Sequence, residues 1–201
     1  MAIWHINGGN RLEGACFVQG SKNAVLPILA ASIVCPTETE LMNVPCLSDV
    51  EASLSILRQL GCTAVREAND VYIDSRSISS NVIPRSMMEC MRSSVLFMGA
   101  LLARCGEVHL TAPGGCKLGA RPIDMHISAM KALGAEVKEC GCEIVCRAHR
   151  LKGARIALPY PSVGATENAM LAACAAEGET VITGAAREPE IEDLQEYLRK
   201  A

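Results

Sequence analysis

The stretch SDVEASLSILRQLGCTAVREANDVYID, residues 48–74, contains a helical pattern followed by two short strand patterns. Its leucines recur at the spacing of one buried helix face, at Leu54, Leu57 and Leu60. The segments CTAVRE and DVYID that follow have the length and composition of paired strands. The stretch therefore predicts an amphipathic helix over a β-hairpin, with Ser48 or Asp49 capping the helix.

The same order of patterns returns 73 residues further along the chain. The segment PIDMHISAMKALG, residues 122–134, is followed by AEVKEC and CEIVCR, and its ALG corresponds to the earlier QLG. Gly61 and Gly134 stand where a helix end favours glycine, and Asp124 is the expected cap of the second helix. Units of this kind bury their faces against one another.

Each helix–hairpin segment is preceded by another helix and a strand. SKNAVLPILAASIV (residues 21–34) precedes the strand TELMNV, and MECMRSSVLFMGALLAR (residues 88–104) precedes the strand EVHLTA. If ACFVQG, residues 15–20, is the first strand, each unit has the order βαβαββ.

A third copy begins with ARIAL and continues through VGATENAMLAACAAEG, TVITGA and EPEIEDLQEYLRK. The acidic residues Glu188 and Glu190 suit the start of its last helix. We therefore predict an α/β (α+β) domain of three βαβαββ repeats, of which the third is truncated. The repeats span about 15–75, 76–148 and 149–201.

Composition limits the class of protein. The chain has 201 residues, a net charge of −3 and 50% hydrophobic residues, which suits one large domain or two small ones. It has no apolar run long enough to cross a membrane and no signal-peptide pattern, so we expect a cytoplasmic protein without a membrane partner. The acidity and the 3% aromatic content argue against a nucleic-acid surface.

The chain contains eleven cysteines, an odd number with irregular spacing. Most have apolar neighbours, so we expect most of them to be reduced core residues. The segment CGCEIVC, Cys140–Cys146, could suggest a metal site, but it lies on a predicted hairpin whose alternate residues point to opposite faces. Structural cysteines are therefore the favoured interpretation there.

The loop APGGCKLGARPIDMH, residues 112–126, places Cys116 after two glycines. Lys117 is adjacent and Arg121 follows five residues after the cysteine. Neighbouring cations and backbone N–H groups favour the thiolate, which is the reactive form of cysteine. From these residues alone, Cys116 is either a reactive thiol or one ordinary thiol among eleven.

A set of five segments resembles one known family. The segments are GSKNAVLPILAA, MRSSVLFMGALLAR, PGGCKLGARPIDMHISAMKALGAEV, PSVGATENAMLAA and AAREPEIEDL. Together they resemble the UDP-N-acetylglucosamine 1-carboxyvinyltransferases, which are EPSP synthase-like enolpyruvyl transferases. The resemblance implies one domain of an inside-out α/β barrel at residues 21–201, with residues 1–20 as an N-terminal strand segment that pairs with a second domain. That C-terminal domain is missing from this sequence and would be needed in cis or in trans.

The resemblance also implies a reaction. The enolpyruvyl group of phosphoenolpyruvate passes to the 3′-hydroxyl of UDP-N-acetylglucosamine with release of phosphate, the first committed step of peptidoglycan synthesis. It implies that Cys116 is the general acid that protonates C3 of phosphoenolpyruvate. It assigns Lys22, Asn23 and Arg121 to phosphoenolpyruvate, and it implies no cofactor and no metal.

The resemblance assigns a larger set of residues to UDP-N-acetylglucosamine. These are Asn23, Arg92, Arg121, Pro122, Ile123, Asp124, Met125, Ser162, Val163 and Gly164. Arg92 could instead extend its side chain to solvent beside an apolar run. Tyr160 and Pro161 stand where other members can carry a lysine and an aliphatic residue, so any side-chain contact of Tyr160 to the uracil would differ. We expect His126 to be a helix-start residue rather than a proton donor or acceptor in the reaction.

Three functions remain open at this point. The first is the enolpyruvyl transferase, with the 201-residue chain inactive by itself. The second is a non-catalytic UDP-sugar-binding fragment or a truncated paralogue. The third is an RNA 3′-phosphate cyclase-like protein built from related units, which the acidic net charge disfavours.

Overall fold

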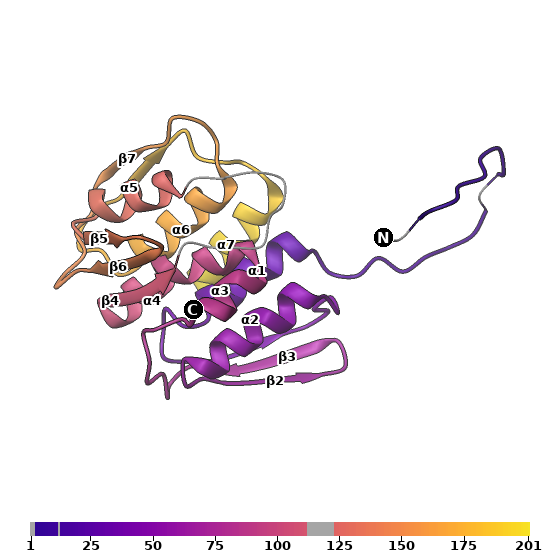
Figure 1. The fold of residues 1–201 in the computed structure, drawn as a ribbon, viewed down its shortest axis with the longest axis horizontal. Helices are drawn as coiled ribbons and strands as arrows, with labels where there is room; N and C mark the ends of the chain where they lie inside the picture. The colour runs from indigo at the N-terminus through magenta and orange to yellow at the C-terminus, as the bar shows by residue number, and fades with distance from the viewer. Residues whose placement is uncertain (1–2, 12, 112–122) are drawn as a thin grey trace.

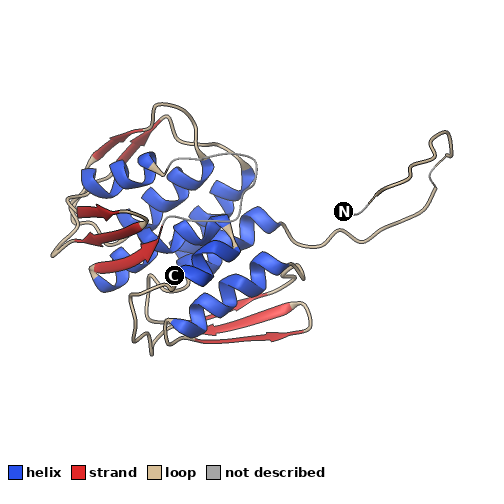
Figure 2. Cartoon of the chain, in the orientation of Figure 1, coloured by secondary structure: helices blue, strands red, loops and turns tan. Residues whose placement is uncertain are grey.

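The computed structural model describes residues 3–11, 13–111 and 123–201. The helices gather in the middle of the domain and the sheets lie on its outside (Figure 1, Figure 2). Three sheets are present among the described residues, one for each predicted repeat. The arrangement is an α/β domain, as predicted. Cys116, Arg121 and Pro122 lie outside the described residues.

The first repeat contains α1 (Lys22–Ala31), β1 (Glu38–Leu41), α2 (Ser48–Gln59), β2 (Thr63–Glu67) and β3 (Asp70–Asp74). The strands form an antiparallel sheet in the order β1-β3-β2. Helix α2 buries its leucine face against this sheet, as the leucine spacing predicts. Gly61 follows the helix with a φ of 96°, the left-handed conformation that favours glycine at a helix end.

The second repeat follows the same plan. Its helical part is α3 (Arg85–Cys90), a 3₁₀ helix η1 (Arg92–Leu96) and α4 (Phe97–Cys105). The strand β4 (Glu107–Thr111), the helix α5 (Asp124–Ala132) and the hairpin β5 (Glu136–Cys140) and β6 (Glu143–Arg147) complete it. The sheet has the order β4-β6-β5, and Val82 forms a single parallel bridge to His109 where a first strand would lie.

The third repeat contains β7 (Arg155–Ala157), α6 (Val163–Ala173), β8 (Val181–Thr183) and α7 (Pro189–Lys200). Strands β7 and β8 pair in parallel, so α6 is the crossover helix between them. Glu188 precedes α7 and Glu190 lies in its first turn, where acidic side chains suit the helix dipole. The helices, the β-hairpins of the first two repeats and the parallel strands of the third therefore follow in the predicted order, whereas no first strand forms in the first two repeats among the described residues.

The first strand considered for residues 15–20 is not formed, while the pairing of residues 1–20 with a second domain stays a prediction. Residues 15–20 form no strand in this structure, and the described residues before Ser21 run away from the domain as an extended segment (Figure 1). The hydrophobic side chains of this segment are exposed, including Trp4 at 87% and Phe17 at 104%. No described strand lies beside the segment, so its backbone groups have no sheet partner there.

The capping predictions for α2 and α5 are also wrong. Ser48 is the first residue of α2, and the capping position is held by Leu47, which has no side-chain acceptor to offer. Asp124 is likewise the first residue of α5 and follows Ile123 at the cap. Asp49 and Asp124 still lie in the first turns of their helices, where a negative charge is favourable.

The prediction that most cysteines lie in the core is wrong as well. Of the ten cysteines that the structure describes, only Cys62 and Cys146 are buried. Burial raises the pKa of each of these thiols to about 11. Cys140 ends β5 and Cys142 lies in the turn of the hairpin, and both are exposed, whereas Cys146 lies on β6 on the face that packs on the core.

Close packing of α4 against α6 fixes the middle of the domain. Gly99 of α4 is the point of nearest approach, because a Cβ atom there would lie 2.4 Å from the backbone oxygen of Asn168 on α6.

No helix in the described ranges has the length and apolar character that spanning a membrane requires.

Candidate active site at the helix N-termini

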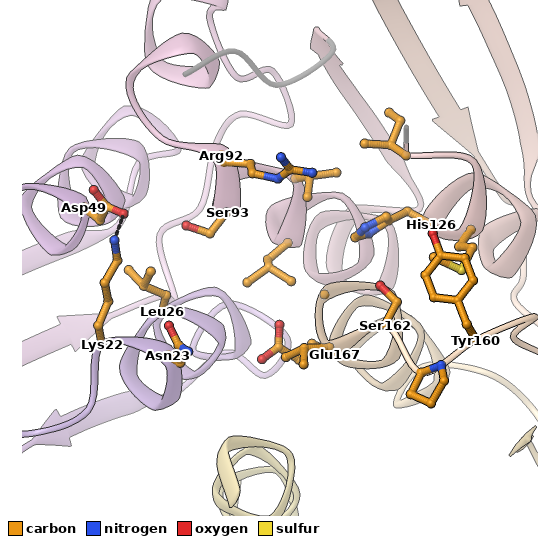
Figure 3. A pocket seen from close by; sticks show the side chains of 17 residues that line it. Lys22, Asn23, Leu26, Asp49, Arg92, Ser93, His126, Tyr160, Ser162 and Glu167 are labelled. Carbon is orange, nitrogen blue, oxygen red and sulfur yellow. Dashed lines mark ion pairs between the residues drawn. The ribbon is translucent and has the colours of Figure 1, made fainter. Parts of the chain in front are cut away.

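Five helices direct their N-terminal ends at one open pocket of about 670 Å³. They are α1, α2, η1, α5 and α6, and they come from all three repeats (Figure 3). Helix N-termini carry unpaired N–H groups and a partial positive charge, which favour anions. The pocket therefore suits a ligand that carries phosphate or carboxylate groups.

The structure brings most of the predicted site residues together. Eight of them line the pocket: Lys22, Asn23, Arg92, Ile123, Met125, Ser162, Val163 and Gly164. Asp124 begins α5 but is not among the lining residues. Cys116, Arg121 and Pro122 fall in residues 112–122, outside the described residues.

Serine caps place the first residues of α1 and α6. The Ser21 hydroxyl accepts a hydrogen bond from the N–H of Ala24, so α1 begins at Lys22. The Ser162 hydroxyl accepts from the N–H of Ala165 and starts α6 in the same way. Because each serine oxygen serves as an acceptor within its helix, the hydroxyl proton of Ser162 stays available to a ligand oxygen.

An interruption between two helices brings Arg92 to the pocket. The predicted continuous helix over residues 88–104 is interrupted at Met91, which is extended with φ −145° and ψ 148°. The buried Ser94 hydroxyl lies 2.7 Å from the carbonyl oxygen of Met91 and 3.2 Å from that of Met88, so its single proton is shared between the two carbonyls at the break. Arg92 thus becomes the first residue of η1 and lines the pocket.

Two contacts hold the α1 end of the site. The Nζ of Lys22 lies 2.5 Å from Oδ2 of Asp49, the second residue of α2. The Nδ2 of Asn23 donates to Oε1 of Glu190 on α7 at 3.3 Å. This bond takes one of the two Nδ2 protons of Asn23, so the side chain can still offer the second proton as a donor and its oxygen as an acceptor.

Glu167 adds a carboxyl group to the pocket. It lies on α6, is only 4% exposed and makes no hydrogen bond or ion pair with another described residue. Burial raises its pKa to about 8, and the nearby Glu190 and Glu188 contribute in the same direction. At neutral pH the side chain is therefore mainly a neutral acid that can donate a hydrogen bond.

Sequence reasoning missed Asp49 and Glu167, and it gave His126 no place in the pocket. All three line the pocket. Glu167 was detectable in principle, because it is a charged residue within the otherwise small and apolar segment VGATENAMLAA. The described residues include no group of three histidine, cysteine or acidic side chains arranged to hold a metal ion.

Comparison with known proteins identifies the family. The family model for EPSP synthase (3-phosphoshikimate 1-carboxyvinyltransferase) matches residues 6–201. A UDP-N-acetylglucosamine 1-carboxyvinyltransferase 2 from Caldanaerobacter subterraneus subsp. tengcongensis is 47% identical over 198 residues, which cover 98% of this chain and 48% of the relative. The corresponding enzyme from Trichlorobacter lovleyi is 45% identical, covering 97% of this chain and 47% of the relative.

Solved structures have the same fold. The enolpyruvyl transferase NikO from Streptomyces tendae aligns with a TM-score of 0.84 at 22% identity, over 96% of this chain and 45% of that chain. EPSP synthase from Acinetobacter baumannii aligns with a TM-score of 0.70 at 20% identity, over 89% and 42% of the two chains. The chain spans about half the length of the curated relatives it matches. With the family model matched over residues 6–201, this chain belongs to the EPSP synthase family.

Proposed function

We propose that this chain forms half of the active site of a UDP-N-acetylglucosamine 1-carboxyvinyltransferase. The observation that carries the proposal is the convergence of five helix N-termini, Lys22 and Arg92 on one pocket. Both proposed substrates are polyanions, so a pocket built this way matches their chemistry. The relatives named for this activity support the same substrates.

In the proposed reaction, the 3′-hydroxyl oxygen of UDP-N-acetylglucosamine bonds to C2 of phosphoenolpyruvate while C3 gains a proton. Loss of a proton from C3 and cleavage of the C2–O bond to phosphate then give the enolpyruvyl ether and inorganic phosphate. We propose Cys116 as the acid that protonates C3, by resemblance to the family. This step would begin peptidoglycan synthesis, in the cytoplasm.

The pocket residues divide between the two substrates in this proposal. Lys22 and Asn23 on α1, together with Arg121, would contact phosphoenolpyruvate. Arg92, residues 121–125 and Ser162–Gly164 would contact UDP-N-acetylglucosamine, with the N–H groups of α6 facing the diphosphate. Tyr160, 56% exposed at the pocket, would replace the lysine contact of other members with an aromatic surface.

The rest of the machinery would come from elsewhere. Addition of a hydroxyl to phosphoenolpyruvate needs a base near that hydroxyl and further cations around the phosphate. The carboxylates that line the pocket among the described residues are already engaged or protonated: Asp49 pairs with Lys22, and Glu167 is mainly neutral. We therefore propose that the part of the relatives that this chain does not cover supplies the base, in cis or in trans.

Binding of UDP-N-acetylglucosamine to the 201-residue chain tests the proposal. Arg92→Ala and Arg121→Ala should each weaken binding about 10-fold or more, as loss of a charge-assisted hydrogen bond does. Lys131→Ala, which removes an exposed cation at the far end of α5, is the matched control and should bind like wild type. Equal affinities for all four proteins would reject the site.

A second measurement tests turnover. Phosphate release from phosphoenolpyruvate should be absent with the chain alone and should appear on mixing with a separately expressed C-terminal half of a relative. Cys116→Ala should abolish the recovered activity. Cysteine-dependent turnover by the chain alone would contradict the division of the active site, and saturable nucleotide binding with no recovery would favour a non-catalytic UDP-sugar-binding role.

A further inference from the structure

The buried side chain of Asn168 makes hydrogen bonds whose direction is fixed. Its Oδ1 accepts from the backbone N–H of Gly99 at 2.6 Å, and its Nδ2 donates to the carbonyl oxygen of Val95 at 2.9 Å. A backbone N–H only donates and a carbonyl only accepts, so the amide has one permitted orientation. Asn168 is 0% exposed, and both backbone partners belong to the α4 and η1 segment against which α6 packs.

This orientation determines the protonation of the neighbouring histidine. Nδ2 of Asn168 also lies 2.9 Å from Nδ1 of His126 on α5. An amide nitrogen carries two protons and accepts none, so the histidine nitrogen must be the acceptor. Nδ1 is therefore bare, and the proton of the neutral ring is on Nε2.

The surroundings of His126 favour this neutral form. The residue is 8% exposed, and burial, helped by the positive charge of Arg92, lowers its pKa to about 4. Asp124 on the same helix acts in the opposite direction and is outweighed. Glu167 of α6 lines the same pocket and has a pKa of about 8, so its charge changes near neutral pH, and the charged pair of Lys22 and Asp49 also lines the pocket.

The Cε1–Nε2 edge of the ring lies against the start of α6, at the wall of the pocket. His126 lines the pocket, and its ring extends from α5 toward the centre of the site (Figure 3). Gly164 at the start of α6 makes room for it, because a Cβ atom at residue 164 would lie 3.3 Å from Cε1 and 3.7 Å from Nε2. The Nε2–H group thus lies beside the N–H groups that begin α6.

We propose that Asn168 fixes His126 in the Nε2–H form, and that this group donates a hydrogen bond to a phosphate oxygen of the sugar nucleotide. The donor role rests on the proposed function, because it needs the nucleotide in this pocket. Asn168 is a positioning residue here: it touches the histidine and not the ligand. A neutral donor of this kind keeps its proton from about pH 5 to about pH 8, so its contribution to binding is constant across that range.

Nitrogen-15 NMR of the histidine rings tests the assignment without any ligand. In wild type, Nδ1 of His126 should give the signal of a bare ring nitrogen and Nε2 that of a protonated one at pH 7. Asn168→Asp should reverse the two, because a carboxylate accepts from Nδ1–H. A protonated Nδ1 in wild type would overturn the proposal even if Asn168→Asp fails to fold.

Two substitutions at His126 test the donor role by titration with UDP-N-acetylglucosamine. The variant His126→Gln places an amide N–H near the position of Nε2, whereas the shorter side chain of His126→Asn does not reach it. His126→Gln should bind within about twofold of wild type, and His126→Asn should bind about 3- to 10-fold more weakly. Thermal unfolding of both variants serves as the folding control.

The outcomes separate the two levels of the proposal. Equal loss of affinity in both variants, with both folded, would overturn the donor role. Absence of nucleotide binding by wild type would refute the proposed function for this chain and the ligand contact with it. In that case the assignment of the histidine proton still stands or falls on the NMR signals alone.

Discussion

The ammonium group of Lys22 is bound to the carboxylate of Asp49, with 2.5 Å between Nζ and Oδ2. The two residues begin neighbouring helices, α1 and α2, and both line the pocket. Their side chains are 47% and 26% exposed, so the pair contributes little to folding, about 0–1 kcal/mol. Its consequence lies in ligand binding, because an anion at Lys22 must compete with Asp49.

Asp49→Asn should therefore tighten the binding of phosphoenolpyruvate to the chain. The substitution keeps the size of the side chain and removes the competing negative charge, and we expect a gain of about threefold in affinity at low salt. Titration followed by NMR measures the effect. Asp193→Asn, which removes an exposed acid on α7, is the control. Weaker binding by Asp49→Asn would mean that the carboxylate serves to hold Lys22 in place.

The raised pKa of Glu167 predicts a loss of stability as pH rises. Its carboxyl group has a pKa of about 8 in the folded chain against 4.5 for an unperturbed glutamate. Between these values the folded state binds more protons than the unfolded state, so the free energy of unfolding falls with increasing pH. The slope from this one group is at most about 1.4 kcal/mol per pH unit.

Glu167→Gln should remove that slope. Urea unfolding between pH 6.5 and pH 8 measures it, with the exposed Glu192→Gln as the control. This window avoids the opposite contribution of His126, whose pKa is lowered from 6.5 to about 4 in the folded chain. Because the unfolded chain binds that proton more readily, His126 lowers the free energy of unfolding as pH falls below 6.5. Parallel pH profiles for wild type and Glu167→Gln would show that Glu167 is ionised in the folded chain.

Much of the fold followed from the sequence because the repeats carry local signals. The leucine spacing of α2, the glycines after α2 and α5 and the alternation in the hairpins all reflect local geometry that the structure confirms. The break at Met91 could not be predicted in this way, because residues 88–104 contain no proline and no glycine near Met91 that would mark the end of a helix. The buried hydroxyl of Ser94 stabilises the break through contacts that exist only in the folded chain.

The site followed from the sequence less completely. Lys22, Arg92 and residues 162–164 were identified through resemblance, and the structure brings them to one pocket. Asn168 was missed because a polar side chain in a helix is most often exposed, and Glu167 was missed although a charged residue in the small and apolar segment VGATENAMLAA is unusual. Their roles depend on which residues of α4, α5 and α7 pack against them, and this information is not local in sequence.

Gly99→Ala should destabilise the domain by about 2–4 kcal/mol, because the added methyl group has no space. A Cβ atom would lie 2.4 Å from both the backbone oxygen and the Oδ1 of Asn168, so α4 and α6 would have to separate. Denaturant unfolding measures the loss. Gly8→Ala is the control, since nothing lies within 4 Å of a Cβ atom there. A change below about 0.5 kcal/mol would mean that the two helices move apart easily.

Cys116 should be the most rapidly alkylated thiol of the chain. Lys117 and Arg121 beside it favour the thiolate, which is the form that reacts. Burial raises the pKa of Cys62 and Cys146 to about 11, and partial burial of the sulfur raises the pKa of Cys105 and Cys174, whose residues are otherwise exposed, so these four thiols should react more slowly.

Brief alkylation with less than one equivalent of iodoacetamide, followed by peptide mass spectrometry, ranks the eleven thiols. The exposed Cys140 and Cys142, on a hairpin that contributes no residue to the pocket, are internal controls for simple accessibility. Lys117→Ala should slow labelling of Cys116 and leave the two controls unchanged, because only Cys116 has that cation beside it in sequence. Labelling of Cys116 no faster than the controls would remove the chemical basis for its proposed role as the acid that protonates phosphoenolpyruvate.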